Sequence, residues 1–220
     1  MNEASKRALI IVDLQPDFLP GGALAVPEGD AVVAPILALL GRRDRYAVVV
    51  ATQDWHPAAH GSFAANHPGR SPGELIDLEG LQQILWPTHC VAETPGAALV
   101  PELAARRDEL DAVFRKGTEV GVDSYSGFFD NGRRKATGMG EWLRERGIEA
   151  VDVCGLALDY CVKFTALDAL SLGFATTLIQ DACRAVELSP GDGARAAAAI
   201  AENGGRVVDS ATILSEAGGR

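Results

Sequence analysis

Short, almost uninterrupted apolar runs alternate along the chain with stretches whose apolar residues recur at helical spacing. The apolar runs are Arg7–Val12, Tyr46–Thr52, Ala112–Arg115, Ala150–Cys154, Ala175–Ile179 and Arg206–Val208. The helical stretches are Asp30–Arg43, Met139–Arg146, Tyr160–Leu172 and Asp192–Asn203. Near-continuous apolar strands that alternate with helices are typical of a parallel sheet covered on both faces. The pattern predicts an α/β fold with a doubly wound, mostly parallel six-stranded sheet and helices on both faces.

Residues 53–110 interrupt this alternation, because they hold only one weak helical signal after the second predicted strand. A loop this long in a compact domain is usually functional or disordered. We therefore expect a single domain over residues 1–220, with a core at about 8–210 and a long loop insertion at 53–110. All four histidines lie in this insertion, at His56, His60, His67 and His89.

Composition narrows the class of protein. The 220 residues are 47% hydrophobic, which is typical of a soluble globular domain. The formal net charge is −10, so no basic surplus exists to neutralise nucleic-acid phosphates or an anionic membrane. No apolar run approaches the ~20 residues of a membrane span. A strand pattern starts almost at the N-terminus without a signal-peptide pattern, so we expect a cytoplasmic protein.

Reactive side chains follow four of the predicted strands. Asp13 follows the first strand, Asp54 and His56 the second, Lys116 the third and Cys161 the fourth. Ligands of parallel α/β sheets bind beyond the carboxyl ends of the strands. Reactive residues at four strand ends along one edge of a sheet predict a shared site.

Cys161 is the strongest candidate for a nucleophile. Asp159 is a suitable N-cap for the next helix, which would place Cys161 in a first turn that favours a thiolate. A free cysteine is more often buried and structural, and we assign that role to Cys154 and Cys183. Position alone leaves both interpretations of Cys161 open. A nucleophile also needs a base and a charge partner, which Asp13 and Lys116 could supply.

The spacing Asp54-x-His56 is the second candidate constellation. Residues i and i+2 of an extended chain point to the same face, so a carboxylate and an imidazole could share one ion. Two histidines and one carboxylate suit Fe(II), Mn(II) or Zn(II). The third ligand would be His60, His67 or His89. The spacing alone is also compatible with surface histidines beside an aspartate that ends a strand.

Ordered motifs along nearly the whole chain resemble those of the bacterial nicotinamidases, also called pyrazinamidases, of the isochorismatase-like hydrolase superfamily. The resemblance runs from about residue 8 to 210. It is carried by Ala8–Phe18, Pro20–Val26, Gln53–Pro57 with His60–Phe63, Trp86–Val91, Phe114–Gly117, Asp123–Asn131 and Gly155–Val162.

The resemblance implies roles for individual residues. It implies a catalytic triad of Asp13, Lys116 and Cys161, and a divalent metal ion held by Asp54, His56 and His89, with His60 a weaker candidate. It also implies a cis peptide bond between Leu156 and Ala157, and an oxyanion hole made by the backbone N–H groups of Ala157 and Cys161. The implied walls of the substrate pocket are Phe18, Leu24, Trp86 and Tyr125. Leu158 departs from the pattern, because many relatives carry threonine there.

The implied activity is hydrolysis of nicotinamide to nicotinate and ammonia through a cysteine thioester, in NAD salvage, with pyrazinamide as a second substrate. The implied cofactor is one zinc, iron or manganese ion, and the only implied partner is the small-molecule substrate. The sequence is also compatible with a homo-oligomer.

Three rival functions remain at this point. The first is a metal-free amidohydrolase or carbamoyl hydrolase of the same superfamily, which usually lacks the D-x-H…H set. The second is an iron-dependent redox enzyme, which would leave Cys161 unexplained. The third is a binding module on an inactive hydrolase scaffold, which the intact triad disfavours. A dinucleotide-binding Rossmann domain is excluded, because no G-x-G-x-x-G follows the first strand.

Overall fold

A six-stranded parallel sheet forms the centre of the computed structural model, which describes residues 6–216. The strand order is β5-β2-β1-β6-β7-β8. The strands are β1 Arg7–Val12, β2 Val48–Asp54, β5 Ala112–Lys116, β6 Ala150–Leu156, β7 Ala175–Arg184 and β8 Arg206–Val208. The predicted doubly wound parallel sheet is confirmed.

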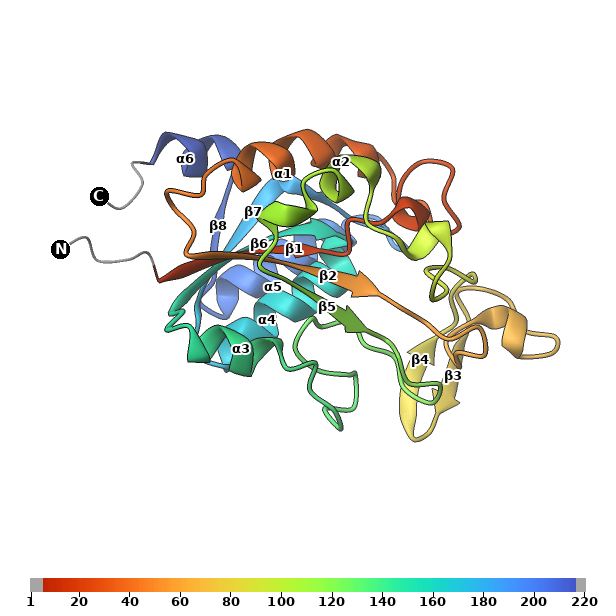
Figure 1. The fold of residues 1–220 in the computed structure, drawn as a ribbon. Coiled ribbons are helices and arrows are strands. Elements are labelled where there is room, and N and C mark those ends of the chain that lie inside the picture. Colours follow the sequence, from red (N-terminus) through yellow and green to blue (C-terminus); the bar gives the residue numbers. More distant parts are fainter. Residues whose placement is uncertain (1–5, 217–220) are drawn as a thin grey trace.

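Helices cover both faces of this sheet (Figure 1). Helices α1, α2 and α6 lie on one face, and α3, α4 and α5 lie on the other. Their bounds are α1 Val33–Leu40, α2 Pro101–Ala104, α3 Met139–Glu145, α4 Lys163–Ser171, α5 Asp192–Glu202 and α6 Ser210–Ser215. Among the described helices, none is long and apolar enough to cross a membrane.

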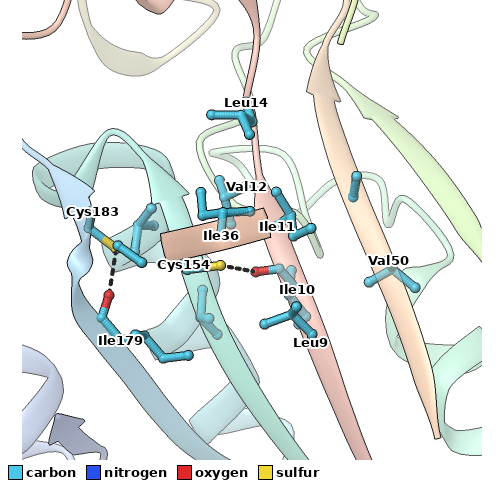
Figure 2. Close-up of a cluster of buried hydrophobic side chains, with 14 of the residues drawn as sticks. Leu9, Ile10, Ile11, Val12, Leu14, Ile36, Val50, Cys154, Ile179 and Cys183 are labelled. Atoms are coloured by element: carbon cyan, nitrogen blue, oxygen red, sulfur yellow. Dashed lines mark hydrogen bonds between the residues drawn. The ribbon is translucent and has the colours of Figure 1, made fainter. Parts of the chain in front are cut away.

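The apolar side chains of β1 explain why this segment forms the centre of the sheet. Every residue from Ala8 to Val12 is fully buried, because β1 is a central strand whose two faces are both covered. Figure 2 shows these side chains packed beside β6 and β7. Cys154 and Cys183 lie in the same core, as expected, and their thiols donate to the carbonyl oxygens of Ile10 (3.7 Å) and Ile179 (3.3 Å).

The long insertion differs from the expected irregular loop. It contains an antiparallel hairpin of β3 Leu75–Leu78 and β4 Leu81–Ile84, which extends away from the main sheet in Figure 1. Both strands are four residues long, and β3 alternates exposed and half-buried side chains. Strands this short and this exposed leave little hydrophobic signal in the sequence.

Four strands reach further toward the carboxyl edge of the sheet than predicted. They continue to Asp54 in β2, Lys116 in β5, Leu156 in β6 and Arg184 in β7. β1 passes close to β6 at Gly155, where an added Cβ would lie 2.0 Å from the Val12 carbonyl oxygen. Only glycine fits this approach, since its φ is also +120°. The close approach brings the end of β1 beside the turn that follows β6.

Candidate active site

The structure brings the predicted triad residues together around one ammonium group. Lys116, the last residue of β5, places its Nζ 2.8 Å from Oδ2 of Asp13 and 3.2 Å from Sγ of Cys161. The same Nζ lies 2.5 Å from Oδ1 of Asp54 and donates to the Ser124 carbonyl oxygen at 2.9 Å. All four side chains are buried. Lys116 therefore links the triad to the candidate metal ligands.

Asp13 is held so that one carboxylate oxygen faces the cysteine. Thr52 on β2 donates its hydroxyl hydrogen to Oδ1 at 2.6 Å, and its oxygen accepts the backbone N–H of Asp13 at 3.2 Å. Oδ2 is paired with the Lys116 ammonium but accepts no aligned hydrogen bond from the described residues. One oxygen of Asp13, one of Asp54 and the Cys161 sulfur all lie within 4.8 Å of one another. Oδ2 is therefore available to accept the thiol proton.

Burial and neighbouring charges act on the pKa values of this triad in opposite directions. Burial raises the pKa of the Cys161 thiol well above its ordinary value, although Lys116 acts in the opposite direction. This direction opposes the thiolate expected from the helix start. Burial also raises the pKa of Asp13 to about 6, partly offset by Lys116. Burial alone would lower the pKa of Lys116, but Asp13 and Asp54 raise it well above its ordinary value.

These pKa values predict the acid limb of the pH–activity profile. Asp13 must be ionised to accept the thiol proton, so kcat/KM should fall tenfold per pH unit below about pH 6. An ordinary aspartate, with a pKa near ~3.9, would place the limb about two units lower. The profile should be measured together with bound metal at each pH. A limb near pH 4 at full metal occupancy would contradict Asp13 as the base.

The turn after β6 places Cys161 at the start of a helix, as expected, but its N-cap residue differs from the predicted one. Leu158–Val162 form a π-helical turn that continues into α4, and the peptide bond between Leu156 and Ala157 is cis. The N-cap position belongs to Ala157, so the predicted cap by Asp159 is wrong. The Asp159 carboxylate instead accepts the backbone N–H groups of Val186 and Glu187, each at 2.9 Å. Asp159 therefore binds the loop after β7 and does not cap its own helix.

The candidate metal ligands converge on one point. Oδ2 of Asp54 lies 3.6 Å from Nε2 of His56 and 3.8 Å from Nε2 of His89. The Nδ1–H groups of the two rings donate to the carbonyl oxygens of Gly117 and Pro87, both at 2.8 Å. In the neutral rings each Nε2 then carries the lone pair and faces Asp54, which is the usual arrangement of metal-binding histidines.

The charges of this group fit a divalent cation. Burial opposes ionisation of Asp54, yet Lys116, His56 and His89 hold its pKa well below the usual range. Burial and neighbouring His56 lower the pKa of His89 to about 4, so His89 keeps its lone pair at neutral pH. Burial would lower the pKa of His56 too, but Asp54 raises it. A carboxylate and two imidazoles with remaining coordination positions suit zinc, iron or manganese.

His60 stands apart from that ligand set. It belongs to a second group, with His56 and Asp123, whose candidate ligand atoms lie within 4.8 Å of one another. Burial and His56 lower the pKa of His60. His67, the fourth histidine, contacts the Gly61 carbonyl oxygen through Nε2 and joins neither group.

A pocket of about 350 Å³, open mouth included, lies between the triad and the metal ligands. All four predicted wall residues line it, as do Asp54, His89, Ala157 and Cys161. Three lining residues were not predicted: Asp123, Tyr160 and Val186. Asp123 and Tyr160 lie inside the matching motifs beside predicted residues, so the motifs carried a signal for both. Val186 reaches the pocket from the loop after β7 and has no comparable signal.

Comparison with known proteins places this geometry in a family. Residues 7–212 match the isochorismatase domain family. The chain belongs to the isochorismatase family. The matched residues include all the strands and helices described above, except for the last residues of α6.

Relatives within the isochorismatase family are similar over most of the chain. The chain is 52% identical to the nicotinamidase of Escherichia coli strain K12, over 86% of this chain and 88% of that protein. A solved nicotinamidase and pyrazinamidase of Acinetobacter baumannii superposes with a TM-score of 0.89 at 41% identity, covering 96% and 99% of the chains. The pyrazinamidase of Pyrococcus horikoshii, solved in complex with zinc, superposes at 0.74 with 36% identity, covering 93% and 99%.

Proposed function

We propose that the chain is a nicotinamidase that hydrolyses nicotinamide to nicotinate and ammonia and also accepts pyrazinamide. The observation that carries the proposal is one small pocket with a buried cysteine, its base and its lysine on one side and a carboxylate–imidazole ligand set on the other. The cysteine with its base and lysine supports amide hydrolysis. The carboxylate–imidazole set supports recognition of a ring that contains a nitrogen atom. The 52% identical E. coli nicotinamidase supports the same assignment.

Asp13, Lys116 and Cys161 carry the proposed chemistry. Asp13 accepts the Cys161 thiol proton while the sulfur forms a bond to the carboxamide carbon. The positive charge of Lys116 stabilises the negative charge on the Cys161 sulfur and on the Asp13 carboxylate. The backbone N–H groups of Ala157 and Cys161 hold the negatively charged oxygen. Loss of one such donor typically lowers turnover ~10²–10³-fold.

The intermediate then breaks down in two steps. The carbon–nitrogen bond breaks as Asp13 returns its proton to the leaving nitrogen, which releases ammonia and leaves a thioester on Cys161. Asp13 next accepts a proton from water, and the resulting hydroxide attacks the thioester carbon. The carbon–sulfur bond breaks, the proton on Asp13 returns to the sulfur, and nicotinic acid leaves and loses its own proton to solvent as nicotinate.

Asp54, His56 and His89 would hold one divalent metal ion. When bound, the ion would supply a Lewis acid for the ring nitrogen and so help to orient the ring. The Pyrococcus relative contains zinc, while iron and manganese suit the same donor atoms. Phe18, Leu24, Trp86 and Tyr125 would enclose the ring. The rings of Trp86 and Tyr125 both contact Tyr160 edge to face, at 4.8 and 5.3 Å between centroids, which stiffens this wall.

An ammonia-release assay with three amides tests this function. Nicotinamide and pyrazinamide should be hydrolysed rapidly, and a chelator should suppress both reactions until metal is restored. Benzamide is the matched control, because it has the same carboxamide but no ring nitrogen, and it should react far more slowly. No ammonia from nicotinamide would reject the function. Equal rates for benzamide and no effect of chelator would instead support a metal-free amidohydrolase.

A further inference from the structure

His60 carries a buried polar atom that the proposed mechanism does not use. Its side chain is fully buried, its Nδ1 accepts the backbone N–H of Ser62 at 3.2 Å, and the Ser62 hydroxyl lies 2.7 Å from the same nitrogen. A backbone N–H can only donate, so the lone pair of the neutral ring is at Nδ1 and the ring proton is at Nε2. Nε2 makes no hydrogen bond of normal geometry among residues 6–216, although the backbone of Val122 also interacts with this ring. A buried donor without a partner is costly and calls for an acceptor.

With its proton at Nε2, His60 offers no lone pair to a metal ion from that atom. An imidazole nitrogen binds a metal through its lone pair, and Nε2–H of neutral His60 has none. Nor does His60 belong to the group in which Asp54, His56 and His89 offer atoms within 4.8 Å of one another. Two ligand atoms on opposite sides of one ion, each about 2.1 Å from it, are still closer together than 4.8 Å. A fourth direct ligand would therefore belong to the same group. His60 therefore lies one layer outside the ion's own ligands.

Asp123 supplies an acceptor on the other side of the same space. Its carboxylate is buried, lines the substrate pocket and lies within 4.8 Å of candidate atoms of His56 and His60. Oδ1 accepts the backbone N–H of Ser124 at 2.7 Å, and Oδ2 accepts Nε2–H of Gln83 at 3.1 Å. These two bonds leave lone pairs on the carboxylate. Ligand-type atoms of His60 and Asp123 thus lie within 4.8 Å of one another and of His56, and no hydrogen bond joins the two side chains among residues 6–216.

We propose that His60 and Asp123 together hold one water molecule against the metal ion bound by Asp54, His56 and His89. The water accepts Nε2–H of His60 and donates one hydrogen to Asp123, which leaves a lone pair for the ion. This arrangement fixes one coordination position with solvent and directs the substrate ring to another. His60 and Asp123 are then positioning residues of the outer shell. The inference rests on the proposed function only in requiring that the ion is bound.

Titration with Mn(II), followed by electron paramagnetic resonance, tests this role without measuring activity. The variants are His60→Phe, which keeps a ring and removes the donor, and Asp123→Asn, which keeps the shape and removes the charge. Each should lower Mn(II) affinity ~10–100-fold, the usual effect of losing an outer-shell partner. Line broadening by ¹⁷O-labelled water should decrease in both. The double variant should be no weaker than the weaker single variant, because both residues act through one water.

His67→Phe is the matched control, since this histidine belongs to no candidate ligand group of residues 6–216 and bonds through Nε2 to the Gly61 carbonyl oxygen. This variant should leave affinity and broadening unchanged. Wild-type affinity and broadening in both folded variants would overturn the proposed water. Loss of a ¹⁴N coupling to Mn(II) in His60→Phe would overturn it too, because His60 would then be a direct ligand. Additive effects in the double variant would show two unrelated structural roles. A wild-type chain that binds no Mn(II), zinc or iron would instead reject the metal site of the proposed function.

Discussion

Replacing Cys161 with alanine is expected to abolish ammonia release from nicotinamide while metal content and thermal stability stay near their wild-type values. Loss of a catalytic nucleophile typically lowers turnover by on the order of 10⁴–10⁶-fold. Cys161 faces the pocket and lies 3.2 Å from Lys116 Nζ, so the sulfur is placed to attack. The variant also spares Asp54, His56 and His89. Metal analysis and calorimetry of the same preparation should therefore show an intact but inactive protein.

Cys154→Ala is the matched control for that experiment. Cys154 is equally buried and stands on β6 just before the nucleophile turn, but its thiol donates to the Ile10 carbonyl oxygen within the core. The control should lose some stability and keep its turnover number. Turnover by Cys161→Ala within tenfold of wild type would exclude the cysteine as the nucleophile.

Replacing His89 with alanine is expected to lose the metal ion and raise KM for nicotinamide steeply. His89 presents Nε2 toward Asp54 at 3.8 Å, and it also lines the pocket. Removing a direct ligand should weaken metal binding by more than the ~10–100-fold typical of an outer-shell partner. KM should change more than kcat, because the triad residues on the other side of the pocket remain in place.

His67→Ala separates this effect from the general loss of a histidine in the same insertion. His67 joins no candidate ligand group, so this variant should retain one metal ion and a normal KM. Normal metal stoichiometry in His89→Ala would move the ligand role to another residue of the insertion. An unchanged KM despite metal loss would contradict recognition of the ring through the ion.

The central sheet could be predicted from sequence because its strands are buried on both faces. Such strands are uninterrupted apolar runs, and β1 and β8 have the predicted bounds. The second half of β7, up to Arg184, includes polar and half-exposed residues and was missed. The β3–β4 hairpin was missed because four-residue strands with partly exposed side chains resemble a polar loop. Burial, which creates the sequence signal, is weak in both regions.

Much of the site could be predicted because parallel strands end at one edge. Asp13, Asp54 and Lys116 follow from that rule, and family motifs added the pocket walls. Thr52 could not be found, because its hydroxyl bond to Asp13 depends on the register between neighbouring strands. The role of Asp159 was misjudged because Val186 and Glu187, distant in sequence, compete with local capping. Contacts across the fold, unlike strand ends, leave no local pattern.

Trapping the covalent intermediate tests the central claim most directly. The chain should be mixed with excess nicotinamide, quenched in acid within one turnover, digested and examined by mass spectrometry. A nicotinoyl group is expected on the peptide that contains Cys161. An initial burst of ammonia is also expected wherever hydrolysis of the thioester is the slower step. Hydroxylamine should remove that group and yield the hydroxamate of nicotinate. Rapid ammonia release with no acyl group on Cys161 under any quench time, and no hydroxamate, would contradict the account.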